Sequence, residues 1–285
     1  MLASLTAIFA SKLAPTEGGI STVFFRFVIL SGLVLLTACG HVEETRSARQ
    51  QQATEFNQRA QRAFLRGEYQ AAATLYENAL QLDVAIENVN GIAINAMNLA
   101  KVNQVLGKTA LAQRYLDYLL EDKALNYAPA HLAAAAVQKS LLRLQENDVA
   151  GATAWVDKAT AYCVSDCTLS GVIDNARASI ALRANDADKA LYWSERAASE
   201  NKNASPLEYA NSLRLAASAR LLKNEHDAAL RLSEEALDID KSLGLPEKIS
   251  QDLLLLAQAH EKLGHVEQAA QCRDRAARIA ATALK

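Results

Sequence analysis

The amino-acid sequence predicts an all-α fold, a solenoid of antiparallel helix pairs, and three observations support this prediction. Roughly one residue in five is alanine and leucine is also abundant, whereas the 285 residues include only 11 glycines and 4 prolines. This composition favours helices, because Ala and Leu lose little side-chain entropy there and Gly and Pro break them. Six turn residues recur with a period near 40 residues, and small residues recur at fixed positions relative to those turns. Such a period is typical of a repeat architecture.

The first segment with a clear pattern lies near the N-terminus. Arg26 precedes a ten-residue apolar run over residues 27–36, which is the order of a signal peptide and is too short for a membrane span of about 20 residues. The run ends Leu36-Thr37-Ala38-Cys39, which resembles a bacterial lipobox. The resemblance implies cleavage before Cys39 and acylation of its thiol. An ordinary core helix or an uncleaved anchor is the alternative reading of the same run.

The lipobox resemblance also implies a location. Two or three acyl chains hold a protein firmly on a membrane, whereas one chain binds only marginally. Gly40 follows the cysteine where the inner-membrane retention signal has Asp, so we expect the outer membrane, facing the periplasm. Residues 1–38 are therefore expected to be a signal peptide, with the true start at Val23 if its codon is GTG. The polar residues 39–53 are expected to be a lipidated tether.

Six turns then divide residues 54–285 into six predicted helix pairs. Gly and Asn occupy all six positions, and these are the residues that accept a left-handed backbone at a helix C-terminus. The spacing between successive turns is 38 to 40 residues. The turn residues are Gly67, Gly107, Asn147, Asn185, Asn224 and Gly264.

Small residues stand at three fixed distances from these turns. Five residues after each turn, all six positions are alanine: Ala72, Ala112, Ala152, Ala190, Ala229 and Ala269. Twelve residues after come Ala79, Leu119, Ala159, Ala197, Ala236 and Ala276, and seven before come Ala60, Ala100, Ser140, Ala178, Ala217 and Ala257. Because small side chains let helix axes approach, these columns predict close packing between helices. Pro129, Pro206 and Pro246 each lie eighteen residues before a turn, where a helix is expected to begin.

The first unit, FNQRAQRAFLRGEYQAAATLYENALQLD, resembles a tetratricopeptide repeat. Gly67, Tyr69, Ala72, Tyr76 and Ala79 all fall where that motif expects them. The last unit is also a good match, whereas units three to five are degenerate, and the resemblance covers about residues 54–282. It implies a right-handed superhelix in which the first helix of each unit lines a concave groove. Because no unit can bury its own apolar face, we expect one cooperative stack.

Few residues suggest chemistry. No nucleophile elbow, zinc-protease motif, P-loop or paired-carboxylate constellation is present, so we expect no catalytic residue, no metal site and no cofactor. Cys163 and Cys167 are expected to form a local structural disulfide; the alternative is a redox-active cysteine pair. His260, His265 and Cys272 do not share one helix face, which favours surface histidines and a buried thiol over a metal site.

The acidic residues near the end of the fifth unit are expected to form a solvated helix face. They are Glu234, Glu235, Asp238 and Asp240. A formal net charge of −2 without a basic patch also argues against a nucleic-acid partner.

The resemblance places candidate partner-binding residues on the first helix of each unit. By register the polar candidates are Asn57, Gln61, Lys101, Gln104, Asn175, Arg183, Asn211 and Arg214, with Phe64, Met97, Val137, Leu141 and Leu182 as apolar neighbours. The chaperone-tail type of tetratricopeptide domain clamps a terminal carboxylate, but Asn57 stands where that clamp has a lysine, so this type is rejected.

Anchor and groove together predict a function. We expect a non-enzymatic, membrane-anchored periplasmic scaffold that binds protein partners and supports assembly or regulation of an envelope complex, such as pilus, secretion, outer-membrane or cell-wall machinery. The alternative is a lipoprotein receptor that captures small molecules or glycans. An enzyme is a third option, which would need a pocket with a perturbed His or Cys.

Overall fold

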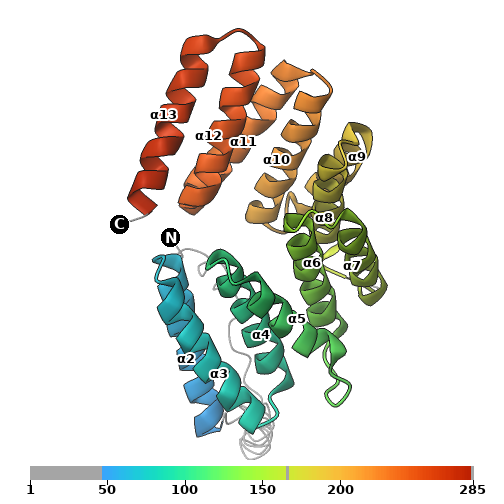
Figure 1. The fold of residues 1–285 in the computed structure, drawn as a ribbon, viewed down its shortest axis with the longest axis vertical. Coiled ribbons are helices and arrows are strands. Elements are labelled where there is room, and N and C mark those ends of the chain that lie inside the picture. The colour runs from blue at the N-terminus through green and yellow to red at the C-terminus, as the bar shows by residue number, and fades with distance from the viewer. Residues whose placement is uncertain (1–46, 165–166, 284–285) are drawn as a thin grey trace, which may run out of the picture. The chain divides into compact units, whose positions relative to one another are not determined.

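The computed structural model describes residues 47–164 and 167–283, and every regular element within these ranges is an α-helix. The predicted signal peptide, Cys39 and the rest of residues 39–46 lie outside the described residues. The twelve described helices follow one another as consecutive pairs (Figure 1). They are α2 (Ala48–Leu65), α3 (Tyr69–Ala85), α4 (Val89–Val105), α5 (Thr109–Glu121), α6 (Pro129–Gln145), α7 (Val149–Tyr162), α8 (Ser170–Arg183), α9 (Ala187–Asn201), α10 (Pro206–Leu222), α11 (His226–Leu243), α12 (Pro246–Lys262) and α13 (Val266–Ala283).

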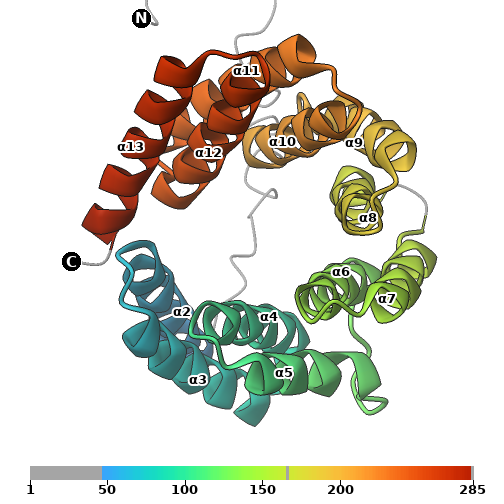
Figure 2. The same ribbon diagram turned by 45° about the horizontal axis from the view of Figure 1, so that its top comes forward.

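The helices form two layers, which we call inner and outer. The inner helices are the first of each pair, α2, α4, α6, α8, α10 and α12, and the outer helices are the second. Each inner helix packs beside the next inner helix, whereas the backbones of successive outer helices lie farther apart throughout the described chain. The stack therefore curves with the inner helices on its concave side, as Figure 2 shows for α4, α6, α8 and α10.

All six predicted turn residues have a left-handed backbone, which confirms the turn assignment. Their φ angles lie between 57° at Asn185 and 77° at Gly67 and Gly264. In each turn the following residue donates its N–H to a carbonyl five positions back, as Glu68 does to Ala63 (2.9 Å) and Glu225 to Arg220 (2.9 Å). This bond satisfies a carbonyl at the helix end that would otherwise lack a partner.

The three columns of small residues are buried throughout. All eighteen positions are at most 3% exposed, so the pattern records the contacts between helices rather than a general preference for alanine. Ser140, the one polar residue among them, donates its hydroxyl to the carbonyl of Ala152 on the partner helix at 2.7 Å. The helix-pair prediction is therefore confirmed at the level of single residues.

Helix starts agree with the sequence at the prolines and differ at the N-terminus. Pro129, Pro206 and Pro246 each occupy the first turn of a helix. The helix α2 begins at Ala48, within the segment expected to be a tether, because Ser47 caps it by accepting from the Gln50 N–H at 3.2 Å. The sequence pattern places this boundary too late because residues 48–52 are polar and show no apolar period, although Ala, Arg and Gln are good helix formers.

The two ends of the stack also meet. Tyr69 at the start of α3 donates its hydroxyl to Glu247 of α12 at 3.1 Å, although 178 residues separate them in the chain.

No described helix combines the length and the apolar character that crossing a bilayer requires.

Candidate binding pocket on the inner helices

A pocket of about 320 Å³ opens on the concave side, and five of the six inner helices, α4 to α12, line it. We call it the inner pocket. Its walls carry both apolar side chains, such as Val137 and Leu141, and charged ones, such as Lys101 and Arg214. A site built from five repeats exists only in the assembled stack, so no single repeat contains it.

The inner pocket follows the sequence repeat. Nearly all of its residues stand sixteen, thirteen, ten or six residues before a turn, a spacing that keeps them on one face of a helix. Glu208 and Lys248 stand sixteen residues before a turn, and Val172, Asn211 and Gln251 stand thirteen before. Val137, Asn175 and Arg214 stand ten residues before a turn, and Lys101, Leu141 and Ser179 stand six before.

Four of the eight polar residues predicted for the groove meet in this pocket. Lys101 comes from α4, Asn175 from α8, and Asn211 and Arg214 from α10. The three helices are far apart in the sequence, and the curvature of the stack brings these residues together.

The structure does not bring the other four to the pocket. Asn57 donates to the Asn95 side chain at 2.6 Å and so connects α2 to α4, and Asn95 in turn donates to buried Asp83. Arg183, at the end of α8, donates to the side chain of the turn residue Asn147 at 2.5 Å. Gln61 is exposed on α2 and Gln104 is half-buried on α4. These four residues lie on inner helices, but not at the positions that line this pocket.

The pocket also contains residues that the sequence-based prediction missed, chiefly Glu208, Lys248 and Gln251. A signal for them existed, because Lys248 and Gln251 stand in the same positions before Gly264 as Glu208 and Asn211 do before Asn224. The candidate columns predicted from the sequence ended at the fifth unit and so did not reach α12.

Arg214 is the centre of a buried ionic cluster behind the pocket. Its Nε donates to Asp252 Oδ1 of α12 at 2.6 Å, a second guanidinium nitrogen pairs with Asp240 Oδ2 of α11, and Nη1 donates to Asn211. Both aspartates are 0% exposed. This corrects the expectation that Asp240 belongs to a solvated helix face, which fails because its partners lie on other helices and leave no sign in the local sequence.

The two aspartates of this cluster also interact with each other. Burial raises the pKa of Asp252 to about 6; Arg214 opposes this shift, and the neighbouring Asp240 adds to it. Asp240 Oδ1 and Asp252 Oδ2 are buried without a hydrogen-bond partner in the described chain. Burial and the negative charge of Asp240 therefore both favour the protonated form of Asp252.

Glu208 and Asn175 form the second polar group of the pocket. The Asn175 amide donates to the Glu208 carbonyl and to its carboxylate, each at 3.1 Å, and Asn211 donates to the same carboxylate at 3.2 Å. Asn175 is 6% exposed, yet its Oδ1 has no hydrogen-bond partner in the described chain. A buried acceptor without a donor is energetically costly, so a ligand group that donates a hydrogen bond to this oxygen would be favoured.

Lys101 and Lys248 are the remaining cations. Neither forms an ion pair within 4 Å among the described residues. Burial lowers the pKa of Lys248, and the positive charges of Arg214 and Lys101 lower it further, ahead of the opposing effects of Asp240 and Glu208.

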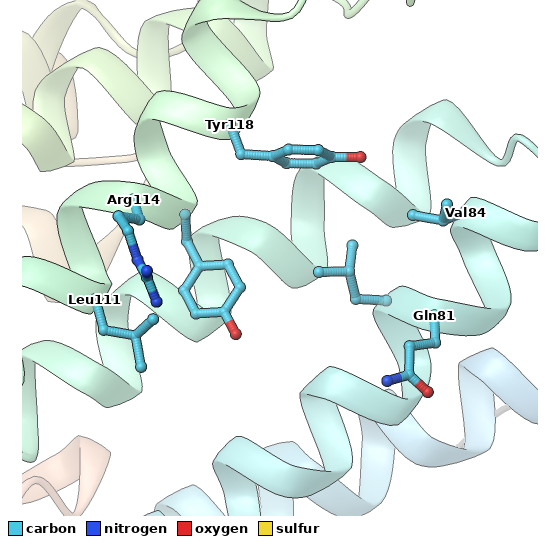
Figure 3. Close-up of a pocket in the computed structure, with 7 residues that line it drawn as sticks. Gln81, Val84, Leu111, Arg114 and Tyr118 are labelled. Carbon is cyan, nitrogen blue, oxygen red and sulfur yellow. The ribbon is translucent and has the colours of Figure 1, made fainter.

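A second pocket of about 480 Å³ lies between the outer helices α3 and α5. Figure 3 shows Gln81 and Val84 of α3 on one side and Leu111, Arg114 and Tyr118 of α5 on the other. Its lining is mostly apolar, and Arg114 is its one charged residue. The inner pocket brings together charged and amide side chains from several helices, whereas this pocket is lined by only two, so the inner pocket is the better candidate site.

The cysteines and histidines show no reactive arrangement in the described chain. Cys163 and Cys167 form a disulfide at the end of α7, with Cα atoms 5.2 Å apart. Cys272 is a buried free thiol whose pKa is raised by burial. His260 and His265 lie across a turn from each other, with 3.4 Å between their Nδ1 atoms. No three His, Cys, Asp or Glu side chains of the described residues are arranged to hold a metal ion.

Comparison with known proteins finds similarity in structure but not in sequence. No family model matches the chain, and no curated protein matches it. Among solved structures, BtubC (BKLC) from P. vanneervenii matches with a TM-score of 0.56 and 18% identity over 83% of this chain and 92% of that one. A Rap protein complexed with Competence and Sporulation Factor matches with a TM-score of 0.59 and 11% identity, over 83% and 67% of the chains.

A third solved structure, Pseudomonas aeruginosa PilF, matches with a TM-score of 0.53 and 15% identity over 79% of this chain and 90% of that one. At these identities the similarity concerns the fold alone. The helix pairs, the left-handed turns and the columns of small residues agree with the same fold. The chain has a tetratricopeptide-like fold, an all-α solenoid of helix pairs.

Proposed function

We propose that this protein is a non-enzymatic scaffold, anchored through lipidated Cys39 to the periplasmic face of the outer membrane, that binds a protein partner in its concave groove. In this role it supports assembly or regulation of an envelope complex. The observation that carries the proposal is the inner pocket, in which polar and charged residues of five repeats converge on the concave side.

The chemistry of the pocket supports binding rather than catalysis. Glu208 and Arg214 are both held by neighbouring side chains, and no nucleophile lies beside a base within it. Lys101 and Lys248, in contrast, have side chains available to a ligand. Fixed acceptors and free cations on a rigid helical surface are suited to recognition.

One of the similar structures supports a binding role. The Rap protein was solved in complex with Competence and Sporulation Factor, so a fold of this type accommodates a bound factor. The anchor rests on the lipobox Leu36-Thr37-Ala38-Cys39.

Crosslinking in cells tests the groove. A photoreactive amino acid at Ser179 or Gln251, which line the inner pocket, is expected to capture a protein partner. The same probe at Tyr192, which is 57% exposed on the outer helix α9, serves as the control. Mass spectrometry of the adducts identifies the partner. If both inner positions give no adduct beyond that seen at Tyr192, the groove is not the binding surface and the proposal fails.

Membrane fractionation tests the anchor. Cys39→Ala removes the only thiol of the lipobox, so the variant is expected to leave the outer-membrane fraction and to lose incorporation of labelled fatty acid. Cys272→Ala, which changes a buried thiol, is the matched control and should stay on the membrane. A Cys39→Ala protein that remains acylated or membrane-bound would overturn the anchor.

A further inference from the structure

Some charged side chains of the inner pocket have ion-pair or hydrogen-bond partners, and others have none in the described chain. Arg214 is paired with both buried aspartates, and Glu208 accepts from Asn175 and Asn211. Lys101 and Lys248 line the same space without a carboxylate within ion-pair distance in the described chain. The pocket therefore has two uncompensated cations beside charges that are already satisfied.

The position of Lys248 is unfavourable for the free protein. The Lys248 side chain is partly buried, and burial lowers its pKa; the nearby charges of Arg214 and Lys101 lower this pKa too, while Asp240 and Glu208 raise it. An anion bound between Lys101 and Lys248 would relieve this repulsion, because a desolvated cation gains more from a paired anion than an exposed one does.

Asn175 adds a second requirement. Asn175 lines the pocket, and its Oδ1 is buried without a donor among the described residues, so a ligand that carries an N–H group as well as a negative charge would satisfy both features. A peptide with an acidic side chain carries both groups, a carboxylate and backbone N–H groups. The volume of about 320 Å³ fits one such side chain with its adjoining backbone.

We propose that the inner pocket binds an acidic segment of the partner protein, with one Asp or Glu carboxylate held between Lys101 and Lys248 and a backbone N–H donated to Asn175 Oδ1. This inference rests on the proposed function, since it names the chemistry of the partner in the same groove. A single carboxylate fits better than a dianionic phosphate, because Glu208 lines the same pocket and repels the second charge.

Peptide binding to the purified full chain tests the proposal. The probe is an acetylated, amidated peptide of alternating Glu and Ala, measured by fluorescence anisotropy beside the same peptide with Gln in place of Glu. The Glu peptide should bind and the Gln peptide should bind at least tenfold more weakly, since only the first has carboxylates. Its affinity should also fall as salt is raised.

Matched double variants locate the site. Lys101→Gln with Lys248→Gln should weaken the Glu peptide at least tenfold. Lys123→Gln with Lys262→Gln makes the same change in net charge at two exposed lysines outside the pocket and should change affinity less than twofold. If both doubles weaken binding equally, the attraction is that of overall charge, and the proposal is wrong. It is also wrong if the Gln peptide binds as well as the Glu peptide, or if neither binds.

Competition experiments distinguish an acidic peptide segment from a small free anion as the occupant of the pocket. Free glutamate or inorganic phosphate that displaces the peptide at comparable concentration would make the occupant a small anion and would overturn the acidic segment. In cells, crosslinks from Ser179 that persist in the Lys101→Gln, Lys248→Gln variant would overturn this inference alone. Absence of any groove crosslink in the wild-type protein would instead overturn the proposed function.

Discussion

At the scale of single residues, the buried charges differ most from the usual tetratricopeptide core of small and apolar side chains. Asp240 and Asp252 are both fully buried beside Arg214. Removing one partner from such a cluster leaves a charge without compensation, which costs more than the intact cluster contributes. The cluster holds Arg214 in place in the wall of the inner pocket, with its guanidinium group already paired.

The first prediction concerns the proton of this cluster. The folded-state pKa of Asp252 is raised from 3.8 to about 6, so the folded protein holds this proton more tightly than the unfolded chain. Its contribution to stability is complete below about pH 4 and is lost as the pH rises through 6. Urea unfolding of wild type should therefore show stability falling over this interval, by up to about 3 kcal/mol from this group, and Asp252→Asn should flatten the curve. Identical pH profiles for the two proteins would contradict the assignment.

The second prediction concerns a turn. Asn185 has φ of 57°, a conformation that costs most L-residues roughly 1–2 kcal/mol. Asn185→Ala should lower the free energy of unfolding by about 1 kcal/mol, whereas Asn185→Gly should leave it unchanged or raise it. Thermal or urea unfolding of the two variants measures the difference, and equal stabilities would show that the turn does not depend on backbone freedom.

The third prediction concerns Lys248. Because burial and nearby cations oppose its charge, Lys248→Gln should keep or raise the melting temperature while it removes binding of the acidic peptide. A gain in stability with a loss of function is the usual sign of a residue retained for binding. A clear fall in melting temperature would instead indicate a structural role.

At the scale of elements, each helix pair depends on the small side chains at its crossing. Ala152 of α7 is 0% exposed, whereas Ala154, on the same helix, is exposed. The Ala152 carbonyl also accepts the Ser140 hydroxyl from α6, so the two helices are held at one separation. Side-chain size and hydrogen bonding at this contact set the distance between the two helices, whereas helix propensity affects only whether each helix forms.

The fourth prediction uses this pair of alanines. Ala152→Leu should destabilise the protein by about 1–3 kcal/mol, because a larger side chain forces α6 and α7 apart. Ala154→Leu should change stability by less than about 0.5 kcal/mol, since its side chain faces solvent. Chemical unfolding of both variants makes the comparison, and equal effects would show that the column is not a packing contact.

The sequence predicts elements and turns well and the site only in part, and the reasons are physical. Turn residues such as Asn185 and packing residues such as Ala152 act locally, so their pattern is visible in the chain. The burial of Asp240 depends on α10 and α12, and the meeting of Lys101 with Lys248 depends on the curvature of the whole stack. Non-local effects of this kind leave no trace in one repeat.

At the scale of the whole molecule, the stack also has contacts between helix pairs that are not neighbours. Each helix pair packs mainly against the next pair, which is the usual condition for a repeat protein. The Tyr69–Glu247 hydrogen bond joins the first pair to the last, and the inner pocket draws on five inner helices. A ligand between Lys101 and Lys248 would therefore bridge distant repeats.

The fifth prediction concerns this hydrogen bond. Tyr69→Phe removes one exposed hydrogen bond and should change global stability by less than about 1 kcal/mol. It should broaden the distance distribution between spin labels on α3 and α12, because the two ends are then held only by the curvature. Addition of the acidic peptide should narrow that distribution again. An unchanged distribution in Tyr69→Phe would show that the hydrogen bond does not restrain the ends.

The columns of small residues have a consequence for the history of this sequence. The fold requires alanine or serine at some positions, a Gly or Asn at each turn and a few large apolar side chains, and these make up a minority of the chain. The remaining surface is free to diverge. Chains with little recognisable sequence similarity can then share the same architecture, as the structures at 11–18% identity do with this chain, although no family model matches its sequence.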